Sequence, residues 1–551
     1  MEIINYSEKR FLVVEDQRPF LVMLRGLLNT MGAQSVAVAQ NAETAISLCR
    51  KEKFDFVVCD IHLGADKKNG FELIEELRLR KLLKPTTVVL VISADSARHL
   101  VIGSIEKEPD DYLIKPFSQI QLKTRLNRAY HRRTELANVY KAMAKDDNEA
   151  AIDACLDLLK GSLNYRQTCL KLLAELYLRN GDYEAAKSLA ERANNQRPIK
   201  WAQKTMAQSH LGLKQPEEAI SMAESLLKAN RFNVDAYDVL ASAHTMQKKH
   251  DSALEDIQQA VSIAPLSLQR QFHAASIARN AGDFEFAKDS CQAIWQISKR
   301  SVHRDVVHLS NYIRSILDVA EHADDKKTRN RFQQEALITL QRNRNDEVFT
   351  RGDDSFDFNL YEAIVHSRIN ALDGKTIQAK KLLEEAQIGI EAKYEEYPLK
   401  LAPDSFKVME EIGDYEDAER LGKLLVSRID ELDPNVRYLI ENENKQHAEQ
   451  HEAYKAHNKA GIEAYRDGKY ETAMQSFTAA KALAPVNIGV ALNLLQSIVK
   501  LLGMQRKPEP KLVIELRQVY KLVNGLPLRD NHQQKLDDLQ EELAPYLDLN
   551  K

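Results

Sequence analysis

Within residues 1–130, short apolar runs alternate strictly with amphipathic segments, and this alternation constrains the fold more than any other feature of the chain. The apolar runs lie at 10–14, 35–39, 54–59, 87–92 and 112–114, and amphipathic segments lie at 19–31, 41–49, 71–79, 97–105 and from 118 onward. Strands that alternate with helices in this way form a parallel sheet with helices on both faces. We therefore predict a five-stranded, doubly wound parallel α/β domain over residues 1–130.

Polar side chains follow these predicted strands where each strand ends. Glu15 and Asp16 follow the first strand, Asp60 the third, Ser93 the fourth and Lys115 the fifth. Ligand sites of open parallel sheets lie beyond the carboxyl ends of the strands. We therefore expect three carboxylates, a hydroxyl and an ammonium group to converge at one edge of the sheet.

These groups form a chemically coherent set. Clustered carboxylates repel one another unless a divalent cation neutralises them, and hard oxygen ligands suit Mg²⁺. A central aspartate such as Asp60 can attack phosphorus and form an aspartyl phosphate. The cation and Lys115 would stabilise charge on the transferring phosphoryl group, and Ser93 could donate a hydrogen bond to it afterwards.

Four segments, FLVVED, VVCDIHL, VLVISA and YLIKPF, resemble the signature blocks of the CheY-like receiver family in their order along the chain. The resemblance covers roughly residues 8–130 and implies a flavodoxin-like fold. It implies that Asp60 is the phosphoacceptor of a two-component response regulator. It also implies that Mg²⁺ is bound by Glu15, Asp16, Asp60 and the main-chain carbonyl of His62.

The same resemblance assigns the remaining site residues. Ser93 matches the switch hydroxyl, Tyr112 the switch aromatic residue and Lys115 the lysine of the family, and the Lys115–Pro116 bond is expected to be cis. The phosphoryl donor implied by the family is a histidine kinase or a phosphotransfer protein. The sequence departs from the family pattern in a longer loop after Asp60, with Gly64 where the family usually has proline.

Beyond residue 130 the sequence becomes repetitive. The segments LAELYLRNGDYEAAKSLAERANNQRP and GIEAYRDGKYETAMQSFTAAKALAP share a pattern of small residues, a turn with an aromatic residue, and a final proline. Alanines at 186, 219, 253 and 287 recur every 33 or 34 residues, a period that resembles the tetratricopeptide repeat. Each unit would be a helical hairpin, with small residues where its two helices cross closely.

This pattern predicts the organisation of the remaining chain as an all-α, tetratricopeptide-like superhelix. We expect a repeat array over 131–300, an irregular helical connector over 301–358, and a second array with C-terminal capping helices over 359–551. A charged helix is expected at 442–459. The helix from Ser118 is expected to continue to Tyr140 without a break, which would make a near-rigid joint between the two regions.

Bulk properties exclude several classes of protein. The net charge of −4 argues against a chain that mainly coats nucleic acid or anionic membrane. Five cysteines without a CxxC pair favour a reducing compartment, and the N-terminal segment lacks a signal-peptide core. No apolar run is long enough for a membrane span. We therefore expect a cytoplasmic protein.

The combined prediction is a response regulator that binds a partner protein or peptide in its repeat groove under the control of Asp60 phosphorylation. It would have no enzymatic output beyond the phosphorylation chemistry of the receiver. One alternative is an inhibitor or phosphate sink that acts on the cognate histidine kinase, and a less favoured one is a DNA-binding transcriptional regulator. The cognate kinase, the groove ligand, the sign of regulation and the oligomeric state stay open at this point.

Overall fold

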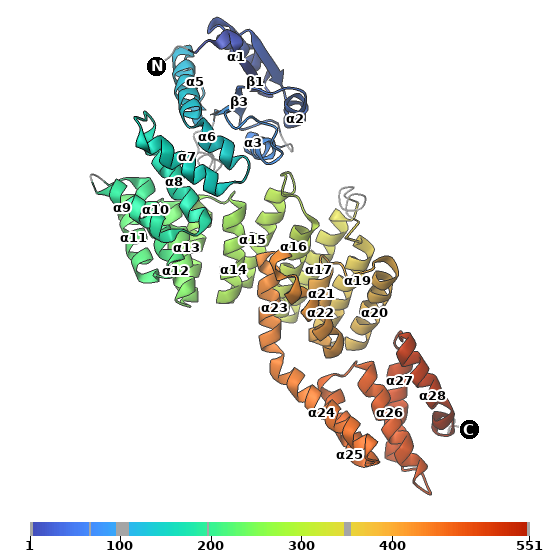
Figure 1. Cartoon of the computed structure of the whole chain (residues 1–551). Helices are drawn as coiled ribbons and strands as arrows, with labels where there is room; N and C mark the ends of the chain where they lie inside the picture. Colours follow the sequence, from blue (N-terminus) through green and yellow to red (C-terminus); the bar gives the residue numbers. More distant parts are fainter. Residues whose placement is uncertain (1–3, 65–67, 95–108, 196–197, 346–353, 548–551) are drawn as a thin grey trace. The chain divides into compact units, whose positions relative to one another are not determined.

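The computed structural model describes residues 4–64, 68–94, 109–195, 198–345 and 354–547. The chain divides into two compact units, Met1–His308 and Leu309–Lys551. The first unit contains a parallel sheet followed by helical hairpins, and the second unit is helical throughout its described residues (Figure 1).

In the described part of the chain, the N-terminal sheet has the five predicted strands. They are β1 (Arg10–Val14), β2 (Ser35–Ala39), β3 (Phe56–Asp60), β4 (Val88–Ser93) and β5 (Asp111–Ile114). All neighbouring strands are parallel, in the order β2-β1-β3-β4-β5. The order reverses at β1, because the chain builds outward to β2 and then returns to β3. Ligands bind beyond such a switch point in open α/β sheets.

Helices cover both faces of this sheet. They are α1 (Arg18–Thr30), α2 (Ala42–Lys51), α3 (Gly70–Leu79) and α5 (Gln119–Glu135). Leu24 of α1 packs in the same core as Val13 of β1, whereas Leu73 of α3 packs in a second core with Leu12. The central strands β1, β3 and β4 are therefore buried on both faces, which explains their continuous apolar runs, whereas the edge strands β2 and β5 are partly exposed. The helix expected over 97–105 lies outside the described residues.

Local signals in the sequence fix where these helices begin. The side chain of Asn41 accepts the Thr44 N–H at the start of α2, and Asn69 and Ser118 form capping boxes at the starts of α3 and α5. Pro19 occupies the first turn of α1, where its missing N–H costs little. These caps place the first turns of the helices next to the carboxyl ends of the strands.

The helix predicted to run unbroken as far as Tyr140 is divided, so this prediction was wrong. Helix α5 ends at Glu135, and α6 (Ala137–Met143) begins after Leu136, whose ψ is 17°. Leu136 is fully buried in the core of the first hairpins, and the Glu135 carboxylate accepts the Asn164 N–H at 2.9 Å. The break arises from these contacts across the fold and not from a glycine or proline.

Helices α6 to α15 pack in succession, each against the next. After α6 they are α7 (Asn148–Lys160), α8 (Arg166–Asn180), α9 (Tyr183–Asn194), α10 (Lys200–Gly212), α11 (Pro216–Ala229), α12 (Val234–Met246), α13 (His250–Ile263), α14 (Leu268–Ala281) and α15 (Phe284–Ser298). The periodic alanines Ala186, Ala219, Ala253 and Ala287 are buried. Their small side chains let the helices approach closely, as the repeat pattern predicts.

The turn inside each hairpin of this array contains one residue with positive φ. Gly181 and Gly282 adopt it with φ of 80° and 78°, and Lys214 and Lys248 adopt it with φ of 59°. Glycine carries this conformation without a Cβ penalty, whereas lysine is strained there. The turns therefore repeat in backbone geometry even where the sequence motif is lost.

The second unit continues with helices that pack as hairpins and pairs. They are α16 (Val306–Glu321), α17 (Lys326–Asn343), α19 (Phe358–Leu372), α20 (Thr376–Lys393), α21 (Ala402–Ile412), α22 (Tyr415–Ser427), α23 (Pro434–Gln446), α24 (Ala448–Arg466), α25 (Tyr470–Leu483), α26 (Ile488–Gly503), α27 (Pro510–Asn524) and α28 (Asp530–Leu547). The segment 301–358, expected as an irregular connector, holds the regular helices α16 and α17. The charged helix expected at 442–459 is divided at His447 between α23 and α24.

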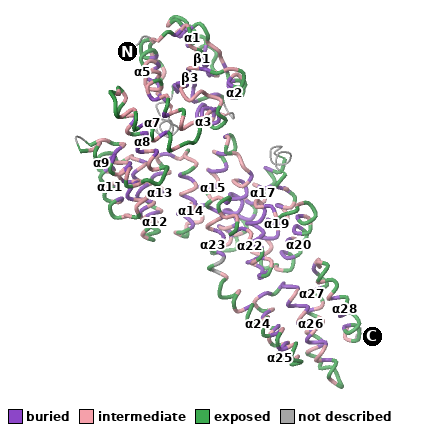
Figure 2. The backbone as a smooth tube through the Cα atoms, in the orientation of Figure 1, coloured by how far each residue is buried: buried purple, intermediate pink, exposed green. Residues whose placement is uncertain are grey.

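Helix α21 explains why the repeat pattern is weak in this unit. Every residue from 401 to 410 is buried, including the charged side chains of Asp404 and Lys407. Asp404 pairs with Arg314 of α16 at 2.6 Å, and Lys407 pairs with Glu443 of α23 at 2.6 Å. Figure 2 shows many buried positions around α17, α19 and α22. Large and charged residues share this core with buried alanines such as Ala379 and Ala418, which obscures the repeat pattern.

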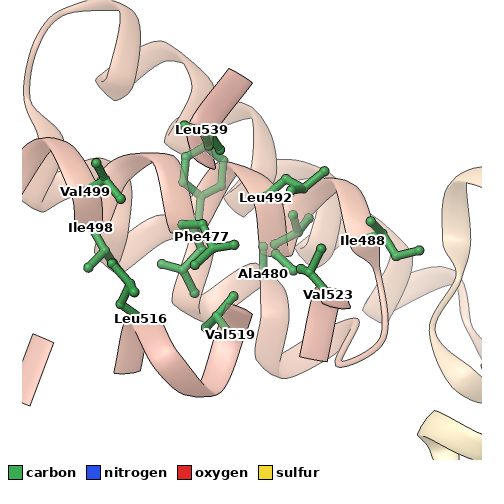
Figure 3. Packing of buried hydrophobic residues seen from close by; sticks show 14 of the residues in the cluster. Phe477, Ala480, Ile488, Leu492, Ile498, Val499, Leu516, Val519, Val523 and Leu539 are labelled. Atoms are coloured by element: carbon green, nitrogen blue, oxygen red, sulfur yellow. The ribbon is translucent and has the colours of Figure 1, made fainter. Parts of the chain in front are cut away.

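The helices α24 to α28 share an apolar core. It combines Phe477 and Ala480 of α25 with Leu492 of α26, Val519 of α27 and Leu539 of α28 (Figure 3). Among the described residues, no helix is both long enough and apolar enough to cross a membrane.

Candidate functional site

The sheet brings the predicted polar residues to its carboxyl edge. Glu15 and Asp16 directly follow β1, Asp60 is the last residue of β3, Ser93 is the last residue of β4, and Lys115 directly follows β5. Because these strands are parallel neighbours, their ends lie side by side. The site is thus built from backbone segments that are up to 100 residues apart in the sequence.

Main-chain hydrogen bonds fix the segments that carry these side chains. The Glu15 N–H donates to the Ala39 carbonyl at 3.0 Å, and the Lys115 N–H donates to the Ser93 carbonyl at 2.8 Å. After Asp60, the Ile61 N–H donates to Ile92 at 3.1 Å. The side chains therefore project from a rigid sheet edge, which favours a preorganised site.

Three carboxylates form the acidic part of the site. One carboxylate oxygen each from Glu15, Asp16 and Asp60 lies within 4.8 Å of the others. Glu15 and Asp60 are buried, and burial raises the pKa of Glu15. Oδ1 of Asp16 and Oδ1 of Asp60 are buried atoms without a hydrogen-bond partner among the described residues.

This arrangement fits a divalent cation. Buried carboxylate oxygens without partners are costly, because each has lost its hydration without a replacement. A hard cation such as Mg²⁺ would supply the missing positive charge and would accept these oxygens as ligands. Glu15, Asp16 and Asp60 are therefore the side chains that would hold it.

Lys115 supplies the cationic group of the site. Its Nζ donates to Asp60 Oδ2 at 2.7 Å and to Glu15 Oε2 at 2.8 Å. Burial favours the neutral amine, but the hydrogen bonds to Asp60 and Glu15 outweigh it and raise the pKa of Lys115. The ammonium group thus stays charged beside Asp60, where a transferring phosphoryl group would build up negative charge.

The other predicted residues occupy neighbouring positions. Ser93 is fully buried at the end of β4, beside Asp60 and Lys115 in the strand order. Tyr112 is partly buried in β5 against the core that contains Leu73. His62 is exposed in the loop after β3, two residues beyond Asp60. The Lys115–Pro116 bond is cis.

Gly70, at the start of α3, contributes to the site although the sequence alone did not single it out. Its N–H donates to the Ile61 carbonyl at 2.8 Å. A Cβ atom at this position would lie 2.1 Å from the Asp60 carbonyl oxygen and 3.1 Å from Cys59 Sγ. Glycine is required here because α3 approaches the backbone of Asp60 too closely for any side chain.

Two aromatic residues were also missed from the sequence. The Lys115 Nζ lies 4.0 Å from the centre of the Phe20 ring, and the Phe117 ring meets Phe20 edge-on at 5.9 Å. The available signal was an aromatic residue in the first turn of the helix that follows the acidic pair. Aromatic residues at such positions are usually attributed to the core.

A second acidic group lies in the other unit, where Glu384, Asp414 and Asp417 gather around Lys380 and Arg529. Lys380 pairs with Asp414 Oδ2, and Arg529 pairs with Asp417 at 2.8 Å. These two cations neutralise most of the charge, so the group acts as an ion-pair network that joins α20, α22 and the start of α28.

The first helices of successive hairpins carry a row of paired charges. Lys204 of α10 pairs with Asp235 of α12 at 2.7 Å, and Asp238 of α12 pairs with Arg270 of α14 at 2.8 Å. Burial lowers the pKa of Lys204, but the carboxylates around it prevail and raise it. These pairs tie neighbouring repeats together and line one side of the array with polar groups.

Comparisons with known proteins agree with this division of the chain. The family model for the response regulator receiver domain matches residues 11–127, and a tetratricopeptide repeat model matches residues 204–267. Both matches fall in the first unit. The chain therefore combines a receiver domain with tetratricopeptide repeats.

Similar proteins match the N-terminal region. The alkaline phosphatase synthesis transcriptional regulatory protein PhoP of Bacillus subtilis is 33% identical over 144 residues, which are 26% of this chain and 57% of PhoP. The chemotaxis protein CheY-3 of Vibrio cholerae is 29% identical over 132 residues, which are 24% of this chain and 99% of CheY-3. The match to PhoP thus spans little more than half of that protein.

Solved structures match the same region. A response regulator from Thermotoga maritima is 28% identical, with a TM-score of 0.20, and the match covers 22% of this chain and 98% of that one. The beryllofluoride-activated DrrB receiver domain is 25% identical, with a TM-score of 0.20 and the same coverage.

Proposed function

We propose that this chain, a receiver domain joined to tetratricopeptide repeats, is a response regulator whose Asp60 is phosphorylated to control binding of a partner protein by the repeats. The observation that carries the proposal is the cluster of Glu15, Asp16, Asp60 and Lys115 at the carboxyl edge of the sheet. It contains two carboxylate oxygens without a hydrogen-bond partner among the described residues and a charged ammonium group. Phosphoryl transfer to a carboxylate needs such a nucleophilic carboxylate and such charge-stabilising groups.

The transfer step uses the residues as follows. A carboxylate oxygen of Asp60 attacks phosphorus, and the bond from phosphorus to the donor breaks with its electron pair going to the donor. A phosphohistidine on a histidine kinase or phosphotransfer protein would release a neutral imidazole after protonation. Lys115, whose Nζ lies 2.7 Å from Asp60 Oδ2, would stabilise the negative charge that grows on the phosphoryl group. Mg²⁺, held by Glu15, Asp16, Asp60 and the carbonyl of His62, would neutralise charge on the phosphoryl oxygens.

Ser93 and Tyr112 are the proposed switch residues. Ser93 ends the strand next to β3, and this position supports a role for its hydroxyl as a hydrogen-bond donor to a phosphoryl oxygen on Asp60. Tyr112 lies one strand further, where a rearrangement of Ser93 would reach it through the paired residues of β4 and β5. Phosphorylation then shifts the balance between two conformations, which a partner must distinguish.

The joint at Leu136 gives this change a route to the repeats. Arg132 and Arg133 of α5 both bind Asp110, next to β5, at 3.2 Å and 2.7 Å. Glu135 holds the segment before α8 through the Asn164 N–H. A shift of β5 would therefore move α5 and the first repeat together, which supports a scaffold output within the first unit.

Relatives such as PhoP are named transcriptional regulators, so a DNA-binding output is the alternative that must be tested. Here the residues after α5 form helical hairpins. Strongly salt-dependent binding of duplex DNA would favour the alternative. An inhibitor or phosphate-sink role on the cognate kinase stays compatible with the proposal and would appear as slower phosphotransfer to a second regulator.

The proposal is tested by hydrogen exchange of the full chain with Mg²⁺ and beryllofluoride, which mimics a phosphoryl group on aspartate. We expect changed exchange at β4, β5 and the helices α5 to α8, and none in an Asp60→Asn variant. Asp55→Asn is the matched control. Asp55 directly precedes the first residue of β3, at the end of the strand opposite to Asp60, and it pairs with Lys84 at 2.8 Å. Exchange that changes only around Asp60 would refute the coupling to the repeats.

A further inference from the structure

The face of one aromatic ring is placed directly against the ammonium group of the site. The Lys115 Nζ lies 4.0 Å from the centre of the Phe20 ring, well within the range of a cation–π interaction. The same Nζ donates to Glu15 and Asp60. The Lys115 side chain is 11% exposed, so water competes little with these contacts.

The Phe20 ring is itself held in place. Phe20 lies in the first turn of α1, and the Glu15 carboxylate accepts the Gln17 N–H just before that turn. Phe117 meets the ring edge-on at 5.9 Å, from the segment that follows the cis Lys115–Pro116 bond. Both aromatic side chains also pack against the core under α1 and α5. These contacts therefore fix the position of the Phe20 ring beside Lys115.

These contacts leave the ammonium group ready for one more partner. It has three N–H groups, of which Glu15 and Asp60 engage two. Among the described residues, Lys115 Nζ has no third hydrogen bond. The ring attracts the charge without accepting a hydrogen bond in the ordinary sense, so one N–H stays available for a phosphoryl oxygen.

We propose that Phe20 is a positioning residue for phosphoryl transfer to Asp60, because its ring face holds the Lys115 ammonium group at a fixed point between Glu15 and Asp60. This inference rests on the proposed function. A lysine on a flexible stem would otherwise sample many positions, and electrostatic stabilisation works best when the charge is placed in advance.

The test changes the aromatic face of Phe20. Phe20→Leu removes the aromatic face, and Phe20→Trp restores a stronger one. A series with one, two and three fluorine atoms on the Phe20 ring weakens the face stepwise with little change of shape. Met23→Leu, on the exposed side of the same helix, is the matched control.

Two measurements are made on the full chain. The first is the rate of Asp60 phosphorylation by acetyl phosphate with Mg²⁺, separated into donor affinity and maximal rate. The second is the NMR shift of the Lys115 ε-methylene protons without metal, since a proton above a ring face is shifted upfield. This second measurement reports the contact independently of any phosphorylation.

We expect Phe20→Leu to lose the upfield shift and to lower the maximal rate about two- to tenfold, with donor affinity preserved. The rate should fall stepwise with fluorination, and Phe20→Trp should retain it. If the parent protein is phosphorylated normally and the fluorinated variants are phosphorylated at the same rate, the role of Phe20 is overturned while the proposed function stands. A parent protein that never labels Asp60 overturns the proposed function and this inference with it.

Discussion

Gly70→Ala tests the close packing that places Asp60. The added Cβ would lie 2.1 Å from the Asp60 carbonyl oxygen, whereas contacts of a Cβ below 3.0 Å are essentially never seen. Helix α3 and the end of β3 would therefore have to separate by about 1 Å, since neither the carbonyl nor the helix backbone can rotate away. We expect a loss of about 3 kcal/mol in the local opening free energy of β3.

The assay is hydrogen exchange of peptides that contain β3, measured under conditions where exchange reports the opening equilibrium. A loss of about 3 kcal/mol corresponds to exchange roughly 150 times faster. A shift of about 1 Å at Asp60 should also slow its phosphorylation by about 100-fold.

The matched control is Gly26→Ala in α1, where a Cβ meets nothing within 4 Å. Because alanine favours a helix interior, this change should stabilise the domain by about 0.5–1 kcal/mol. Exchange of β3 that is equal in the Gly70→Ala variant and the parent would refute the packing argument. It would mean that α3 does not rest against the backbone of Asp60.

Three further predictions concern the helical region. Burial raises the pKa of Glu410 to about 7, above its unfolded value of 4.5, so the folded chain holds an extra proton between these pH values. The free energy of unfolding should therefore fall by up to about 1.4 kcal/mol per pH unit as the pH rises through this window. Glu410→Gln should flatten this decline in denaturant titrations. Arg368→Met removes a buried cation and leaves the partly buried carboxylates of Asp318 and Glu411 without that partner, so it should cost about 3–5 kcal/mol in urea unfolding. Arg428→Met, at an exposed pair, should leave the midpoint unchanged. Lys214→Gly relieves the strain of a φ of 59° and should raise the melting temperature through about 1 kcal/mol of added stability. Lys228→Gly inside α11 should lower the melting temperature. A lower melting temperature for Lys214→Gly than for Lys228→Gly would contradict the assignment of strain to the turn.

The sequence predicted those parts of the fold that depend on local pattern. Strand ends follow from short apolar runs, so the sequence pattern alone places Asp60 and Lys115 at one edge of the sheet. The period of the buried alanines, such as Ala219 and Ala253, follows from close helix crossing and predicted the hairpins.

The remaining features depend on contacts between distant segments. Nothing near Leu136 in the sequence signals a break, because its burial and the bond from Glu135 to Asn164 are tertiary. In the sequence Lys407 resembles a solvent-exposed lysine, but in the fold it is surrounded by carboxylates from α16 and α23. Phe20 resembles a core residue, and its position under Lys115 emerges only when β5 is placed beside β4.

The central claim is that Asp60 accepts a phosphoryl group in a site that holds a divalent cation. It is tested most directly by intact-mass and peptide mapping of the full chain after incubation with acetyl phosphate, with Mg²⁺ or with a chelator. The account predicts one added phosphoryl group on Asp60 that requires Mg²⁺ and is absent from Asp60→Asn. A chain that stays unlabelled with Mg²⁺, or that carries the phosphoryl group elsewhere, would contradict it.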